Sequence, residues 1–135
     1  MEICPGDFAK CFAFWDFEND KEKQSKLATE VNNGRRKMFV YVVNGKYVGG
    51  FSISLKADAD GWFLSYLSIT EPWRNRGIGS KIVDYSINYV KEMGEGSIFL
   101  RVLRGNAGAK RLYERKGFIL FDDTIPHRIT MVRAV

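Results

Sequence analysis

A seven-residue segment, Arg74–Ser80, constrains the fold of this chain more than any other. It follows an apolar run, Trp62–Ile69, that has the length of a buried strand, and it leads into an amphipathic run, Ile78–Met93, that is typical of a helix. The first amides of a helix have no partner inside the helix and carry partial positive charge. A glycine-containing turn between a strand and a helix is therefore a suitable site for a phosphate or another anion.

The side chains of this segment support the same interpretation. Gly77 and Gly79 leave the backbone open to a close approach, Arg74 and Arg76 add fixed positive charge, and Ser80 adds a hydroxyl. We therefore predict a pyrophosphate site. A P-loop would need a lysine directly after the last glycine, and a Rossmann fingerprint would need a third glycine, so neither pattern fits.

The pattern Arg-x-x-Gly-x-Gly at residues 74–79 resembles the signature of the GNAT superfamily of acyl-CoA-dependent N-acetyltransferases. The segment Asn106–Phe118 resembles the second hallmark of that family, which is Asn-x-x-Ala, then Leu-Tyr, then Gly-Phe on the penultimate helix. Asn106 and Tyr113 are seven positions apart and so share one face of a helix. The interval between the motifs has room for one helix and one strand, as the family order requires. The resemblance is close over residues 36–121 and covers the N-terminal third only in general layout.

The resemblance implies an α/β fold, the GNAT (acyl-CoA N-acyltransferase) fold, in which a mixed β-sheet is flanked by helices on both faces. We expect one domain over residues 1–135, in the order β-α-α-β-β-β-α-β-α-β-β. The expected strands are 1–4, 37–43, 47–55, 62–69, 97–103, 118–121 and 128–135. The expected helices are 7–17, 20–31, 76–93 and a last one from Asn106 to a left-handed end at Gly117. Asn44-Gly45 predicts a tight hairpin turn.

The family also implies the donor, acetyl-CoA, and a direct attack of an amine on the thioester. Its two central strands, here 62–69 and 97–103, splay apart and hold the pantetheine arm. Backbone groups near Leu67 and Ile69 are expected to bind that arm, and an amide near Ile69 to polarise the acetyl carbonyl. The pyrophosphate is expected on the amides of the loop. The cofactor-binding residues implied are Leu67, Ile69, Arg74, Arg76, Gly77, Ile78, Gly79, Ser80 and Asn106.

Tyr113 is the expected catalytic residue. Its family counterpart lies near the thioester sulfur, where a phenol with a pKa of about 10 can protonate the departing thiolate. Residue type alone favours a core aromatic for Tyr113, and it is the motif that favours the catalytic role. Asn106 could be a helix N-cap, a cofactor contact or both.

The general base is left unassigned, because strand 62–69 carries no carboxylate where many family members have one. Glu71 falls nearer the expected pyrophosphate than the amine. A water chain through Ser65, Tyr66 or a backbone carbonyl could carry the proton, or the amine could bind already neutral. His127, the sole histidine, is interpreted as a turn residue.

Acceptor specificity is expected from the N-terminal helices and the last hairpin. Residues 12–20 alternate aromatic and acidic side chains, which would suit a cationic amine but equally a helix that packs its aromatic face and exposes its acids. The predicted enzyme acetylates a primary amine of a small molecule or a protein. The rival hypotheses are a catalytically idle acyl-CoA-binding module and a basic nucleic-acid-binding protein.

The net charge of +5 does not by itself favour nucleic acid, because two of the four basic clusters belong to the motifs above and no nucleic-acid motif is present. No apolar run approaches the roughly 20 residues that span a bilayer, and Met1–Trp15 lacks a basic leader. Cys4 and Cys11 are expected to be reduced thiols of a cytoplasmic protein. No metal site is expected. An exposed sheet edge at Arg128–Val135 would be compatible with a homodimer.

Overall fold

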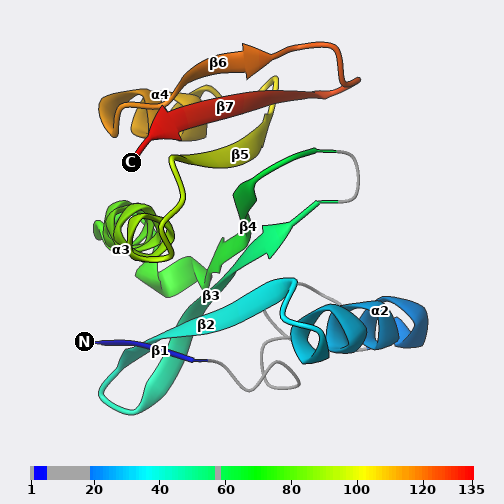
Figure 1. Ribbon diagram of the computed structural model, residues 1–135. Coiled ribbons are helices and arrows are strands. Elements are labelled where there is room, and N and C mark those ends of the chain that lie inside the picture. Colours follow the sequence, from blue (N-terminus) through cyan, green and yellow to red (C-terminus); the bar gives the residue numbers. More distant parts are fainter. Residues whose placement is uncertain (1, 6–18, 57–58) are drawn as a thin grey trace.

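The computed structural model describes residues 2–5, 19–56 and 59–135 (Figure 1). Seven strands of these residues form one sheet, in the order β1-β2-β3-β4-β5-β7-β6. The strands are β1 (Glu2–Pro5), β2 (Arg36–Val43), β3 (Lys46–Leu55), β4 (Trp62–Ile69), β5 (Ser97–Leu103), β6 (Ile119–Asp122) and β7 (Arg128–Ala134). The helices are α2 (Lys21–Asn32), the short 3-10 helix η1 (Glu71–Trp73), α3 (Ile78–Glu92) and α4 (Ala107–Arg115).

The predicted order of elements is confirmed wherever the structure describes the chain, with shifts at some ends. β1 continues to Pro5, which lies on an outer strand where a missing N–H is tolerated. Helix α3 begins at Ile78 rather than at residue 76, because the left-handed Gly77 precedes its first turn. Phe118 is a buried core residue just before β6 and not its first residue. The expected helix 7–17 lies outside the described residues.

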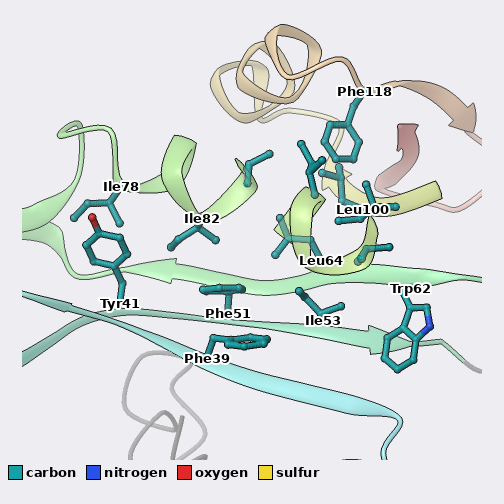
Figure 2. Packing of buried hydrophobic residues seen from close by; sticks show 14 of the residues in the cluster. Phe39, Tyr41, Phe51, Ile53, Trp62, Leu64, Ile78, Ile82, Leu100 and Phe118 are labelled. Carbon is teal, nitrogen blue, oxygen red and sulfur yellow. The ribbon is translucent and has the colours of Figure 1, made fainter. Parts of the chain in front are cut away.

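Two cores lie on opposite faces of the sheet, because side chains alternate along each strand. On β2, alternate side chains from Phe39 to Val43 enter the larger core, which α3 and α4 cover (Figure 2). The intervening side chains, Met38 to Val42, pack with Leu27 of α2 in a smaller core. The inward residues predicted for α3 are all buried: Ile82, Val83, Ile87 and Val90. Helices therefore flank both faces, as expected.

A buried arginine fastens α2 to the sheet. Arg36 is 4% exposed, and its Nη2 lies 2.9 Å from the Glu30 carboxylate of α2. Its Nη1 donates to the Ser52 hydroxyl of β3 at 2.6 Å. Because the charge is both paired and hydrogen-bonded, its burial is compensated.

The pairing between β4 and β5 stops early. These parallel strands match only Trp62–Leu64 with Ile98–Leu100. Further along, β4 continues to Ile69 and β5 to Leu103 without pairing to each other (Figure 1). The sheet therefore opens between its two central strands, as the resemblance implied.

A β-bulge lies at the same place on β4. Tyr66 and Leu67 together oppose the single residue Phe51 of β3, and Tyr66 has a left-handed φ of 54°. A bulge changes which face the following side chains meet. Tyr66 accordingly packs on the α2 side of the sheet, and its neighbour Leu67 packs against the larger core.

The structure corrects the expected sheet edge. β7 is not an outer strand, because it pairs with β5 on one side and with β6 on the other. The outer strand is β6, whose Ile119, Leu120 and Phe121 are 66%, 56% and 62% exposed. A dimer formed by strand pairing at this end of the sheet would have to use β6. Among the described residues, no helix has the length and apolar character needed to cross a membrane.

We predict that Phe51→Ala destabilises the fold by about 3–5 kcal/mol, because the ring is fully buried and stacks on Phe39 at 5.1 Å. Phe121→Ala is the matched control, because that ring is 62% exposed and should cost about 1 kcal/mol or less. Urea unfolding measures both. Equal losses for the two variants would contradict the described core.

Candidate active site

A cleft of about 380 Å³ opens where β4 and β5 separate. Its walls come from both strands, from α4, and from single residues of α2, the end of β3 and the start of β7. The lining residues are Lys23, Lys56, Phe63, Leu64, Ser65, Tyr66, Leu67, Leu100, Arg101, Val102, Leu103, Asn106, Ala109, Tyr113 and Arg128. The cleft thus lies where the unpaired strand edges face each other.

Asn106 and Tyr113 both line this cleft, so their predicted common face is confirmed. Asn106 is the N-cap of α4, and its Oδ1 accepts from the Ala109 amide at 3.1 Å. Tyr113 packs edge-on against Phe118 with the ring centres 6.1 Å apart. Burial raises the pKa of the Tyr113 phenol above its usual value. Tyr113 is therefore both a core aromatic and a protonated hydroxyl group at the cleft wall at neutral pH.

The loop before α3 has the backbone shape that an anion site needs. Asn75 and Gly77 have left-handed φ values of 61° and 81°. Gly77 is the N-cap of α3 and has no side chain to satisfy the first amides of the helix. The α3 N-terminus is therefore left for an external acceptor.

The two arginines of the loop have contacts within the protein. Arg74 donates from Nε to the Ile69 carbonyl at 2.8 Å and so ties the loop to the end of β4. The Arg76 guanidinium lies 4.9 Å from the centre of the Trp73 ring. Both arginines are exposed and leave the rest of their guanidinium groups at the surface.

Gly79 is a position where the protein itself would accept a larger residue. A Cβ there would meet Ile69 and Leu112 only at 3.7 Å, which is ordinary contact. These contacts also show that the first turn of α3 lies against the end of β4 and against α4. The other predicted cofactor residues differ in burial. The Ile78 side chain is buried in the larger core, and Leu67 and Ile69 are half-buried against that core. Ser80 is half-buried on the first turn of α3.

The structure leaves the general base unassigned. Within the described residues, no Asp, Glu or His lines the cleft. Ser65 and Tyr66 do line it, and the Ser65 hydroxyl lies 3.1 Å from that of Ser54. Glu71 is exposed on η1, and His127 is an exposed turn residue with a φ of 65°. No group of residues that could hold a metal ion occurs in the described part of the chain.

Sequence reasoning missed a group of cations on the α2 side of the cleft. Lys56 and Arg101 both lie over the Phe63 ring, at 6.0 and 5.0 Å. The Lys56 and Lys23 ammonium groups also each lie 5.8 Å from the centre of the Tyr66 ring. Alternation along 97–103 could have placed Arg101 on this face, but nothing in the sequence brings Lys56 beside it.

Lys56 is the most perturbed of these cations. Its pKa is lowered to about 8, mainly by burial and then by the positive charges of Arg36 and Arg101. Glu30 raises it, and Arg128 has the smallest lowering effect. A second hollow of about 410 Å³ shares Phe63 and Arg101 with the cleft. Its lining includes Asp60 and Asp122, whereas the cleft itself has only cationic side chains among its described charged residues.

The sequence matches a family described as Acetyltransferase (GNAT) family over residues 6–118, which is most of the chain. Among curated proteins, it is 37% identical over 57 residues to N-alpha-acetyltransferase MAK3 of Arabidopsis thaliana. That match covers 42% of this chain and 30% of the relative, so the chain spans well under half of that protein.

Two solved structures share the fold over essentially the whole chain. Ribosomal-protein-alanine N-acetyltransferase from Brucella melitensis has a TM-score of 0.79 at 16% identity and covers 100% of both chains. A GNAT family acetyltransferase from Elizabethkingia anophelis, solved with acetyl-CoA bound, has a TM-score of 0.75 at 15% identity. The latter match covers 99% of this chain and 97% of that one.

We predict that Lys56 titrates with a midpoint near pH 8. Reductive methylation with carbon-13 formaldehyde, followed by a pH titration in NMR spectra, measures it, and the resonance missing in Lys56→Arg identifies it. Arg101→Gln should move the midpoint upward, because it removes a repelling charge. A wild-type midpoint near 10 would show that Lys56 is an ordinary solvated lysine.

Proposed function

Because the chain belongs to the acetyltransferase (GNAT) family, we propose that it transfers the acetyl group of acetyl-CoA directly to a primary amine of a small molecule or a protein. The observation that carries the proposal is the cleft between β4 and β5, which has Tyr113 on its wall. The uncapped first turn of α3 lies against Ile69 and Leu112, which belong to two of the elements that form the cleft, β4 and α4. This arrangement offers a slot for an extended chain, an anion site and a proton donor.

We propose that the donor lies with its pyrophosphate on the amides of Arg76–Ser80 and its pantetheine arm between the separated strands. Leu67 and Ile69 have no β5 partner, so we assign their backbone groups to the amides of that arm, apart from the Ile69 carbonyl, which accepts from Arg74. Asn106 would contact the donor from the α4 side in addition to capping its helix. The electrostatic attraction comes from the helix terminus and from Arg74 and Arg76.

In the proposed reaction the neutral amine nitrogen attacks the thioester carbon, a C–N bond forms and the C–S bond breaks. Tyr113 gives its phenolic proton to the leaving thiolate, and the amine proton leaves through water near Ser65 or Tyr66. The raised pKa keeps Tyr113 protonated at neutral pH, as an acid requires. The protein contributes mainly by holding the two reactants together.

We propose that residues 1–135 act as one domain in the cytoplasm, without a metal ion. A homodimer would be compatible with the activity.

We predict that Tyr113→Phe lowers kcat by about 100-fold, the usual worth of a positioned general acid, while the Kd for acetyl-CoA changes little. The substitution keeps the ring against Phe118, so folding should persist. Thiol release over a panel of primary amines measures kcat, and calorimetry measures donor binding. An unchanged kcat would assign Tyr113 to the core alone.

We predict that Gly79→Ala weakens acetyl-CoA binding by about tenfold or more without lowering stability. The protein has room for the added methyl, and alanine favours a helix, so only a ligand on the amides would be obstructed. Gly96→Ala is the matched control, because a Cβ there meets nothing within 4 Å and Gly96 is remote in sequence from the loop. Calorimetric titration and thermal unfolding separate the two effects.

The rival functions differ in the same assays. A catalytically idle module would bind acetyl-CoA but release no thiol with any amine. A nucleic-acid-binding protein would show salt-sensitive binding that acetyl-CoA does not displace. Absence of acetyl-CoA binding at millimolar concentration would contradict the proposed function.

A further inference from the structure

Resting on the proposed function, we propose that the acceptor amine also carries a carboxylate, which binds between Lys56 and Arg128 on the α2 side of the cleft. The acceptor would thus be an amino acid-like amine or the N-terminus of an acidic peptide. These share one recognised group, a carboxylate close to a primary amine.

The charge of the cleft carries this inference. Four cationic residues line it, and no described acidic residue does: Lys23, Lys56, Arg101 and Arg128. Arg36, just behind them, is already paired with Glu30, and Arg101 donates to the Thr130 hydroxyl at 3.3 Å. Lys23 and Arg101 both have other contacts within the protein, so we assign Lys56 and Arg128 to the ligand.

The surroundings of Lys56 disfavour its positive charge when no ligand is bound. The side chain is half-buried over two aromatic rings, and Arg36, Arg101 and Arg128 all oppose its charge. Like charges held together in a partly dry cleft repel one another, and a bound anion relieves that repulsion. An anion site explains why these cations converge.

The donor does not account for these charges. The anion site proposed for its pyrophosphate is at the start of α3, which packs on the larger core. Lys56 lies over Tyr66, which packs on the opposite, α2 side of the sheet. Phe63 and Tyr66 of β4 hold the cations at the end of the cleft away from the donor phosphates, which is where an acceptor must enter.

The size of the cleft favours a carboxylate over a bulkier anion. The whole space is about 380 Å³, and part of it must hold the acetyl group and the end of the pantetheine arm. A carboxylate is compact, and a planar guanidinium such as that of Arg128 can bind it with two donors.

The test compares amines that differ only in the carboxylate, at equal concentrations of neutral amine. One arm uses β-alanine and β-alaninamide; the other uses a peptide with N-terminal Glu and the same peptide with N-terminal Gln. We expect kcat/KM to favour the carboxylate about tenfold or more in one arm, which identifies the source. No preference in either arm, or a stronger preference for O-phosphoethanolamine over both carboxylates, would overturn the inference.

Variants tie the preference to the named residues. Lys56→Met and Arg128→Gln should each reduce the carboxylate-to-amide ratio about tenfold, Lys56→Arg should retain most of it, and the exposed Lys91→Gln on α3 is the control. Acetyl-CoA affinity is measured in parallel. If Lys56→Met weakens donor binding as strongly as it reduces the ratio, the cations serve the donor and the inference is wrong.

A direct binding measurement separates this inference from the proposed function. Glutarate, which has no amine, is titrated calorimetrically into the CoA-saturated protein, with glutaramide as the neutral comparison. Glutarate binding that Lys56→Met weakens supports the anion site even if no amine is acetylated, in which case the proposed function fails alone. If amines are acetylated but glutarate binds no better than glutaramide, the proposed function stands and this inference falls.

Discussion

The rest of the site depends on the point where β4 and β5 stop pairing. Up to Leu64 and Leu100 the two strands form an ordinary parallel ladder buried by α3. Beyond it the two strands no longer pair with each other, and their facing edges line the cleft. The bulge at Tyr66 lies at this fork, and it turns Tyr66 toward α2 while returning Leu67 to the larger core. The bulge at Tyr66 and Leu67 thus lies where the cleft opens, and it places these two side chains on opposite faces of the sheet.

The two anion sites that we propose, at the start of α3 and on the α2 side of the cleft, differ in the source of the attraction. At the start of α3 the attraction comes from backbone amides, whose geometry is fixed by the left-handed Gly77 and the brace from Arg74 to Ile69. On the α2 side it comes from charged side chains held over Phe63 and Tyr66. Amides carry only partial charge and cause little repulsion when empty. The side chains repel one another, and this repulsion adds to burial, the larger effect, in lowering the pKa of Lys56.

Much of the fold could be predicted because its signals are local. The hairpin at Asn44-Gly45 and the helix end at Gly117 follow from backbone preferences, and both residues of the turn and Gly117 have the expected positive φ. The expected edge at Arg128–Val135 was wrong because strand order depends on which strands meet across the sheet, and β6 folds back outside β7. The cations were missed for the same reason: Lys56 and Arg101 are distant in sequence and meet only over Phe63.

The sequence by itself determined the family resemblance, the glycine-containing turn before α3 and the common face of Asn106 and Tyr113, because each lies within one turn or one helix. Only the tertiary structure decided where the sheet opens, which strand is outermost and which charges face the acceptor. Those features arise between strands, where hydrogen-bond register and side-chain packing are set by the whole sheet rather than by neighbouring residues. The residues that we propose bind the donor can therefore be found in sequence motifs, whereas those that we propose bind the acceptor come together only in the folded chain.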